Sequence, residues 1–474
     1  MRQVSLAIGR ARMVRSVSSG TAVLLVLFAI AVIVRVPTLS QPLVERHSFR
    51  QTQTAWTAVV YRDHGIDLLH PITPVLGPPW EMPFEFPLFQ ALGALLMRSG
   101  LTPEVAMRTL GMGSFLVTAV LVSLLARRLA GPVAATIAAS VFLFSPFGLL
   151  WGRTSMIEYL ATALSLGFVF AAIRWRVTSR VAPWAIALVL GGIAMLVKPT
   201  TAGFWLLAFP LLGFAPDPGP STFRREATRP MAWTLIAIPI LVTLAWTVHA
   251  DAIKAAAPAT RDLTSTALFT WNFGTLDQRL DPAAWLSASK GVVLLGGAAL
   301  PLALVVVTGV RRTKTAARWA WITAATLVPP LVFFNLYVQH DYYAAAMSPG
   351  VALLVGGGVA ELWRRGSGAR AATTAVVALV VAVTFVQGRG YWTAMFKGPE
   401  ADPNHILPRA LDIQRQSSPD EIVAINGSAW DPALLFYAGR WGAQGPEDGS
   451  VLPGYATFVC TQWNDPAPSC VRVP

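Results

Sequence analysis

Long apolar runs constrain this chain more than any other feature of its sequence. They fall at roughly 20–36, 107–126, 131–150, 158–173, 181–197, 201–215, 231–248, 290–310, 317–338, 344–363 and 371–387. A helix that crosses a bilayer needs about 20 mostly apolar residues. Only 13% of the residues are charged, against roughly 25% in soluble proteins. We therefore predict a mainly α, polytopic membrane bundle of about 11 spans, which excludes an ordinary soluble domain.

The N-terminus has the first two parts of a secretory signal. Residues 1–15 are basic and residues 21–34 are apolar. The residues that follow, Val36 to Thr38, do not form the small-residue cleavage site of a signal peptide. We expect this segment to remain as the first span, with the N-terminus in the cytoplasm.

The distribution of charge predicts the orientation of the bundle. If the spans alternate from a cytoplasmic N-terminus, 19 of the 37 Lys and Arg residues lie on inner segments with only three acidic residues. The positive-inside rule favours this arrangement in the cytoplasmic membrane, and it explains the net charge of +13 without nucleic acid. A twelfth apolar run, 86–97, would reverse the later loops if it crossed, so we interpret it as a juxtamembrane helix.

Two parts of the chain have a soluble composition. Residues 38–106 form a long outer loop that we expect to carry juxtamembrane helices, and residues 388–474 follow the last span. We divide the chain into a transmembrane part, 1–387, and a small extracytoplasmic α/β domain, 388–474. Within this domain, residues 421–426 resemble a strand and Asp431 to Gly439 bound a helix. Cys460 and Cys470 form either one disulfide or two free thiols.

Ionisable residues interrupt the apolar runs almost only at the predicted outer face. Such residues near hydrocarbon are by default functional candidates. Simpler explanations exist for each: Lys198 at a helix end that reaches the interface, Arg153 with Glu158 as a structural ion pair, His340-Asp341 as a plain loop, and Glu85 at a helix N-terminus. The candidates come from five separate stretches: Glu45, Arg46, His47, Arg50, Gln51 and Gln53; Glu81 and Glu85; Arg153 and Glu158; Lys198; and His340, Asp341, Tyr342 and Tyr343.

This mixture of residues suits chemistry on a phosphorylated lipid. Arg and Lys bind phosphate, Arg through bidentate hydrogen bonds. A nearby carboxylate is a candidate general base toward an acceptor hydroxyl or amine. Glu45 and His47 are also adjacent candidate metal ligands, but two such residues are too few to predict a metal site, so we expect no cofactor.

Several motifs resemble the GT-C superfamily of bacterial membrane glycosyltransferases, in particular the protein-mannosyltransferase-like and aminoarabinose-transferase-like members of families 39 and 83. The motifs are HSFRQTQTAWTAVVYRDHGIDLLHP at 47–71, FEFPLFQAL at 84–92, Arg108 in VAMRTL, RTSMIEYL at 153–160, VKPTT at 197–201 and HDYYAAAMSP at 340–349. The resemblance covers about residues 20–440. The chain departs from the family pattern at Glu45-Arg46-His47, where an Asp-Glu pair is usual, and at Gln53, where Asp is common.

The resemblance implies transfer of a sugar from a polyprenyl-phosphate donor at the outer face, inverting and metal-independent, to a lipid, glycan or protein acceptor. The candidate catalytic residues are Glu45, His47 and Glu85. Arg50, Arg153 and Lys198 are expected to hold the donor phosphate, and His340, Asp341 and Tyr343 to close the pocket beside it. Gln51 and Glu158 complete the predicted substrate-binding set.

Two other functions remain open from the sequence, as does a non-catalytic scaffold that has lost its activity. A polysaccharide polymerase or ligase would use lipid diphosphate donors at a similar site. A lipid or solute transporter would place its ionisable residues near the midplane, often in two related halves. The sequence does not distinguish the sugar, the acceptor or the linkage.

Overall fold

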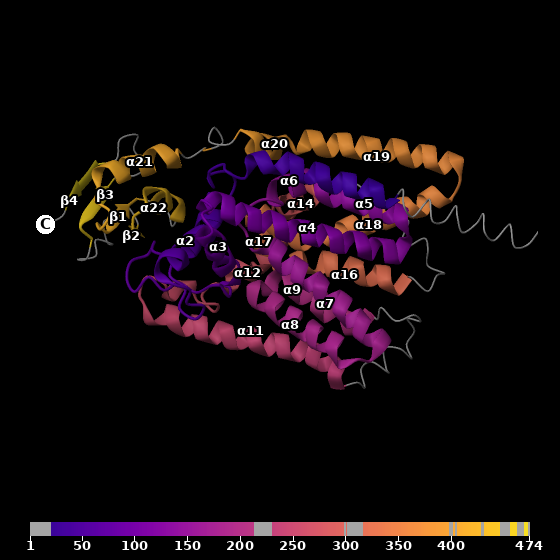
Figure 1. The fold of residues 1–474 in the computed structure, drawn as a ribbon, viewed down its shortest axis with the longest axis horizontal. Coiled ribbons are helices and arrows are strands. Elements are labelled where there is room, and N and C mark those ends of the chain that lie inside the picture. The colour runs from indigo at the N-terminus through magenta and orange to yellow at the C-terminus, as the bar shows by residue number, and fades with distance from the viewer. Residues whose placement is uncertain are drawn as a thin grey trace, which may run out of the picture.

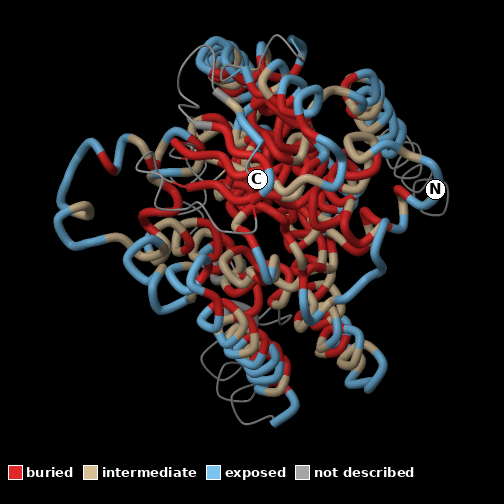
Figure 2. The backbone as a smooth tube through the Cα atoms, turned by 90° about the vertical axis from the view of Figure 1, so that its left-hand side faces the viewer, coloured by how far each residue is buried: buried red, intermediate tan, exposed pale blue. Residues whose placement is uncertain are grey.

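The computed structural model describes residues 20–212, 230–297, 300, 316–397, 402, 405–427, 431–445, 456–461 and 469–472. Figure 1 shows an elongated bundle of helices with a small sheet at one end, next to α2 and α3. Buried residues concentrate in the middle of the molecule, and exposed residues form its outer rim (Figure 2). The mainly helical prediction and the small C-terminal sheet are confirmed.

Four helices of the described part are long and apolar enough to cross a membrane: Gly20–Thr38, α4 (Pro103–Ala130), α7 (Glu158–Thr178) and α11 (Pro230–Ala256). A fifth span is possible where α19 (Ser367–Gln387) and α20 (Arg389–Phe396) meet at a 59° bend. The prediction of about 11 spans is not confirmed. The remaining helices of the bundle are α5 (Pro132–Phe144), α6 (Pro146–Trp151), α8 (Val181–Val197), α9 (Pro199–Leu212), α14 (Pro282–Leu294), α16 (Ala316–Val332), α17 (Phe334–Gln339) and α18 (Ser348–Arg364).

Local sequence explains why some apolar runs do not form one long helix. The run at 131–150 divides into α5 and α6 because Ser145 ends the first helix and caps the second, where Pro146 takes the first position. The run at 317–338 divides into α16 and α17 just after Pro329 and Pro330, which lack backbone N–H groups. An unbroken apolar run therefore does not imply an unbroken helix.

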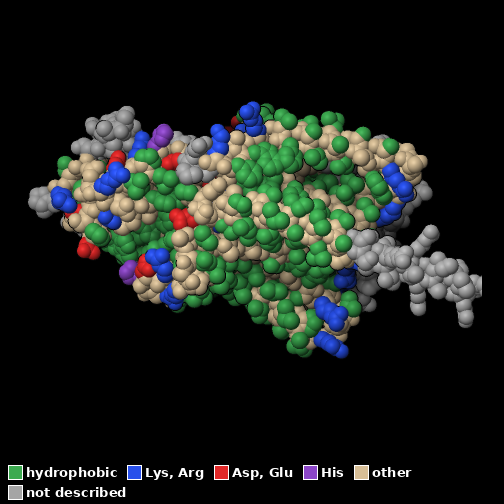
Figure 3. Space-filling view, turned by 45° about the horizontal axis from the view of Figure 1, so that its top comes forward, with side chains coloured by type: hydrophobic (Ala, Val, Ile, Leu, Met, Phe, Trp, Pro, Cys, Tyr) green, Lys and Arg blue, Asp and Glu red, His purple; other side chains and the backbone are tan. Residues whose placement is uncertain are grey.

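The surface is divided by side-chain type. Figure 3 shows a largely hydrophobic flank along the bundle. At the end away from the sheet, the charged side chains visible on this face are Lys and Arg, whereas acidic residues are visible toward the sheet end (Figure 3). A hydrophobic flank of this kind is what a helical bundle presents to lipid.

The first long loop contains two helices at the sheet end. α2 (Ser48–His64) is mostly buried, although its residues include Gln51, Gln53 and three threonines. α3 (Leu88–Arg98) is the expected juxtamembrane helix, and its 11 residues extend only about 16 Å. That length is too short to cross a bilayer, in agreement with the interpretation of run 86–97.

The C-terminal part forms a four-stranded sheet of order β2-β1-β3-β4, with β1 (Val423–Asn426), β2 (Gly442–Gly445), β3 (Phe458–Thr461) and β4 (Ser469–Arg472). β1 is parallel to β2 and β3, and β4 is antiparallel to β3. α22 (Pro432–Ala438) begins after its cap Asp431 and ends at Gly439, as the sequence predicted. Cys460 and Cys470 pair across β3 and β4 and form a disulfide.

The sheet is attached to the first long loop. The backbone of loop residues Pro74 to Gly77 forms three hydrogen bonds with Gly442 and Gln444 of β2, around an isolated antiparallel bridge between Leu76 and Ala443. The two regions also share a hydrophobic core, in which Trp56 of α2 contacts Phe436 of α22. A helix α21 (Ile406–Gln416) packs on α22.

Candidate functional site

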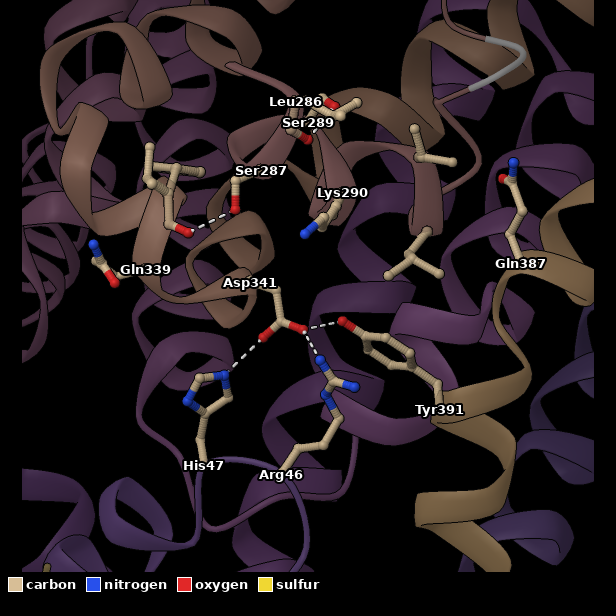
Figure 4. Close-up of a pocket in the computed structure, with 14 residues that line it drawn as sticks. Arg46, His47, Leu286, Ser287, Ser289, Lys290, Gln339, Asp341, Gln387 and Tyr391 are labelled. Carbon is tan, nitrogen blue, oxygen red and sulfur yellow. Dashed lines mark hydrogen bonds and ion pairs between the residues drawn. The ribbon is translucent and has the colours of Figure 1, made fainter. Parts of the chain in front are cut away.

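A cavity of about 520 Å³ opens at the sheet end of the bundle. It lies between the first loop, α14, α17, the segment η4 (Asp341–Ala346), and the junction of α19 and α20. Figure 4 shows the polar side chains that point into it. Its lining consists of Arg46, His47, Leu286, Ser287, Ser289, Lys290, Val293, Leu294, Tyr337, Val338, Gln339, Asp341, Gln387 and Tyr391.

Asp341 is the centre of the polar side of this cavity. Its carboxylate accepts a hydrogen bond from His47 Nε2 at 3.0 Å and pairs with Arg46 Nη2 at 3.1 Å. The Tyr391 hydroxyl donates to the same carboxylate (Figure 4). Burial raises the pKa of Asp341, but the hydrogen bond and charge of His47 and the charge of Arg46 outweigh it and hold the pKa below its ordinary value. Asp341 is thus an anion that orients three neighbours.

The local backbone supports this geometry. His47 immediately precedes α2 and has φ of 54°, a left-handed conformation that is uncommon outside glycine. Gln51 donates from its side-chain amide to the Arg46 carbonyl at 3.1 Å, and the Arg46 guanidinium lies 4.6 Å from the centre of the Tyr391 ring. Strained residues of this kind concentrate at functional sites.

Lys290 is a cation directed into the cavity (Figure 4). Within the described residues, its ammonium group has no hydrogen-bond or ion-pair partner, and the side chain is exposed. The sequence offered little signal for it, because Lys290 stands at the start of the apolar run 290–310 and resembles an ordinary helix flank. Sequence reasoning did not select Lys290 or Tyr391, and it named Arg46 as a candidate without giving it a role.

A second cluster lies around Glu85. Its Oε1 accepts from Arg50 Nη2 at 2.5 Å and from Lys198 Nζ at 3.1 Å, and Lys198 Nζ also pairs with Glu158 Oε1 at 2.9 Å. The Tyr343 ring lies 4.9 Å from the Lys198 ammonium. Burial raises the pKa of Glu85, but the charges of Arg50 and Lys198 outweigh this effect and hold the pKa below its ordinary value, so the carboxylate stays ionised. These side chains come from distant parts of the sequence, as predicted.

Glu85 is held in place through its neighbours on the chain. Trp246 of α11 donates from its indole N–H to the Phe84 carbonyl at 2.9 Å. The Phe86 N–H donates to the Leu196 carbonyl, near the end of α8, at 3.1 Å. The first long loop is therefore fixed on both sides of Glu85 to helices of the bundle.

A third cluster is fully buried. Glu45 Oε1 lies 2.7 Å from Arg108 Nη1 and 3.3 Å from Arg153 Nη1, and the three side chains are at most 1% exposed. The two guanidinium groups also donate to the carbonyls of Thr38, Gln41, Pro42 and Met395. This arrangement ties the first loop to α4 and α20.

The structure thus distributes the predicted site residues over three places. His47 and Asp341 line the cavity. Arg50, Glu85, Glu158, Lys198 and Tyr343 form the second cluster, whereas Glu45 and Arg153 lie in the buried third cluster. The alternative Arg153–Glu158 pair is not what the structure shows, because Arg153 pairs with Glu45 and Glu158 with Lys198. Gln51 supports the Arg46 backbone, and His340 packs on His47 and Tyr342. In the described part of the chain, no group of three or more His, Cys, Asp or Glu residues is placed to hold a metal.

A separate apolar crevice of about 260 Å³ lies between α5, α18 and α19. It adjoins the cavity along α19, where Gln387 lines the cavity while Thr384 and Phe385 line the crevice. Leu294, the last residue of α14, lines the cavity, and Gly296, in the turn that follows α14, lines the crevice.

His340 provides a prediction about pH. Burial and the positive charge of His47 lower its pKa from the ordinary 6.5 to about 4, with Asp341 opposing and Arg50 and Lys198 adding to the effect. Between these values the folded protein binds fewer protons than the unfolded chain, so its stability falls as the pH drops through this window. We expect His340→Gln to reduce this loss, measured as the change in Tm of detergent-purified protein between about pH 7 and pH 4.5.

His64→Gln is the control for this experiment, because His64 is exposed at the end of α2. It should leave the pH dependence of Tm as in the wild type. An equal loss of Tm in the wild type and the His340→Gln variant would contradict a neutral, buried His340.

Comparison with known proteins agrees with this architecture. Residues 81–249 match the profile of the family described as Dolichyl-phosphate-mannose-protein mannosyltransferase. Among curated proteins, none matches the chain. The fold is similar to that of ArnT from Cupriavidus metallidurans bound to undecaprenyl phosphate, with a TM-score of 0.59 and 13% identity over 89% of this chain and 85% of that one. The apo form of the same protein gives a TM-score of 0.58 and 14% identity over 90% and 86%.

A second similar structure is the archaeal oligosaccharyltransferase AglB from Archaeoglobus fulgidus, in complex with an inhibitory peptide and a dolichol-phosphate. The TM-score is 0.57, with 12% identity over 93% of this chain and 69% of that one. At these identities the likeness concerns the fold. The resemblance drawn from the motifs is therefore confirmed: the chain has the fold of the GT-C superfamily of membrane glycosyltransferases, with a family match over residues 81–249.

Proposed function

We propose that this protein is a membrane glycosyltransferase that moves a sugar from a polyprenyl-phosphate donor to a lipid, glycan or protein acceptor. The observation that carries the proposal is the cavity in which Arg46, Lys290, His47 and Asp341 converge beside an apolar crevice. Two cations suit a phosphate, and an apolar crevice suits its prenyl chain. The similarity to a structure bound to undecaprenyl phosphate supports the same ligand class.

The donor is oriented by the two hollows. Its phosphate lies at Arg46 and Lys290, and its prenyl chain continues past Gln387 into the crevice lined by Thr384 and Phe385. The sugar then faces the polar side of the cavity, where His47 and Asp341 lie. Cations placed where charge develops stabilise the transition state rather than only the bound substrate.

The reaction is a substitution at the anomeric carbon. The acceptor hydroxyl or amine attacks that carbon while the bond to the phosphate oxygen breaks, and the leaving phosphate keeps the electron pair. His47 accepts the proton of the acceptor, because Asp341 holds its Nε2 and orients the ring. Arg46 and Lys290 stabilise the growing charge of the phosphate. Glu85 acts electrostatically in this scheme, because its ion pairs hold its pKa below that of a useful base.

We also propose that the cavity opens at the outer face of the cytoplasmic membrane. The N-terminus is then cytoplasmic, residues 1–387 form the transmembrane part and residues 388–474 lie outside. The Lys and Arg side chains at the end away from the sheet support this orientation (Figure 3), and a disulfide between Cys460 and Cys470 suits an oxidising compartment.

Lys290→Ala tests the role of the cavity cations. We expect kcat/KM with a polyprenyl-phosphate sugar to fall by about 10²-fold, because one charge that stabilises the leaving phosphate is lost. The assay is release of the lipid phosphate by purified protein. Lys290→Arg keeps the charge and should retain most of the activity.

Lys397→Ala is the matched control, since Lys397 is exposed just after α20 and does not line the cavity. It should behave as the wild type. Wild-type turnover in Lys290→Ala would remove this residue from the phosphate site, and a requirement for lipid diphosphate donors would favour a polymerase or ligase instead.

A further inference from the structure

The segment from the end of α11 to the first turns of α14 carries leucines that the bundle leaves uncovered. In α13 (Leu276–Leu280), Leu276 is 70% exposed and Leu280 is 71% exposed. Leu286, on the first turns of α14, is 69% exposed. We call these three residues the α13–α14 patch. A group of exposed apolar side chains on one surface commonly marks a site that binds a protein or a membrane.

The opposite side of α13 fixes the direction of the patch. Arg279 donates to the carbonyls of Leu331 at 2.6 Å and Val332 at 3.1 Å, at the end of α16. Gln278 donates to the Asn335 side chain at 2.7 Å. These hydrogen bonds hold one side of α13 against the bundle. Leu276 and Leu280 are four positions apart and therefore share a face of the helix, which points away from the bundle.

The polar groups around the patch are those of a membrane interface. Trp285 is 44% exposed, and its indole N–H donates to the Arg279 carbonyl at 2.7 Å. Such a tryptophan, half apolar and half hydrogen-bonded, is typical of the level at which headgroups meet acyl chains. Asp277 and Asp281 are exposed beside it and suit the aqueous side.

We propose that the α13–α14 patch is inserted in the outer leaflet of the bilayer and forms a lipid-side border of the cavity. Leu286 belongs to the patch and also lines the cavity, so the apolar surface is continuous with the site. A lipid-linked donor then enters sideways across the patch, a consequence that rests on the proposed function. The proposal of insertion itself depends only on the exposure of the three leucines and on the hydrogen bonds that hold α13 against the bundle.

Spin labels test the insertion directly. The two native cysteines are joined in a disulfide, so an introduced cysteine is the single free thiol. Leu276→Cys and Leu280→Cys are labelled in the full-length protein, reconstituted in vesicles of equal parts phosphatidylcholine and phosphatidylglycerol. Asp277→Cys, on the same helix, is the matched control. We expect the ratio of oxygen to nickel-chelate accessibility to exceed unity at both leucine positions and to lie below unity at Asp277→Cys.

Two results would overturn the proposal. A ratio below unity at all three positions would place the patch in water, as expected for a surface that docks an aqueous acceptor. Spin–spin broadening at Leu276→Cys that disappears on dilution with unlabelled protein would assign the patch to contact with a second copy of the chain.

An activity experiment separates insertion from donor entry. In the double variant Leu276→Ser, Leu280→Ser, we expect a severalfold higher KM for a long-chain polyprenyl-phosphate donor, an unchanged KM for a short water-soluble prenyl donor, and an unchanged kcat. An equal rise in KM for both donors would overturn the entry route. If the wild type transfers sugar from neither donor, the proposed function fails while the accessibility result stands.

Discussion

Asp341→Asn is expected to lower kcat/KM by about 10²–10⁴, the contribution usual for general acid–base catalysis. The asparagine keeps the shape of the side chain but loses the charge that orients His47 and pairs with Arg46. An amide that presents its NH₂ group toward His47 Nε2 also favours the wrong tautomer of the imidazole. The measurement is the initial rate of lipid phosphate release over a range of donor concentrations, which separates kcat from KM.

The control for this experiment is Asp277→Asn, the same chemical change at an exposed position of α13 outside the cavity. It should leave both constants unchanged. Retention of more than about a tenth of the wild-type kcat/KM by Asp341→Asn would contradict the proposed His47–Asp341 unit. If Glu85→Gln alone abolished turnover, the base would instead lie in the second cluster.

Glu45→Ala is expected to cause the largest loss of stability. Glu45 is the carboxylate that two fully buried guanidinium groups share, at 2.7 and 3.3 Å. Removing one partner of a buried ion pair costs about 3–5 kcal/mol, because the remaining charge stays uncompensated in a medium of low polarity. The Tm of the detergent-purified variant should fall sharply, with reduced yield from the membrane.

Glu361→Ala removes an ion pair of the ordinary exposed kind, with Arg364, near the other end of the bundle. This substitution should lower the free energy of unfolding by only about 0.2–1 kcal/mol. Equal Tm values for Glu45→Ala and Glu361→Ala would show that the buried cluster does not stabilise the loop. Normal stability combined with loss of turnover would return Glu45 to the catalytic residues.

Sequence patterns predicted the parts of the fold that depend on local chemistry. The Asp431 and Gly439 signals bounded α22 because capping is decided within a few residues. The number of spans was not confirmed partly because helix breaks at Ser145-Pro146 and near Pro329 divide two of the apolar runs. In addition, α8 and α18 have only 17 residues each, and most of the run 290–310 lies outside the described residues. Hydropathy averages over about 20 residues and does not detect such breaks.

The sequence predicted which ionisable residues would lie together at one edge of the bundle, but it did not predict which of them form ion pairs. Glu85 and Lys198 meet as expected from their common position at one edge of the bundle. Arg153 pairs with Glu45 instead of lining the cavity, because the choice among several nearby acids depends on packing that no spacing encodes. Lys290 carried no motif, and its importance follows only from the cavity that it enters.

The backbone hydrogen bonds between loop residues 74–77 and β2 have a consequence for engineering. Exchange of the C-terminal region between related proteins would break the hydrogen bonds between this region and the first loop. A chimera therefore needs residues of the first loop and of β2 that match each other. A fusion or truncation that disturbs β2 should therefore alter turnover, although no residue of β2 lines the cavity.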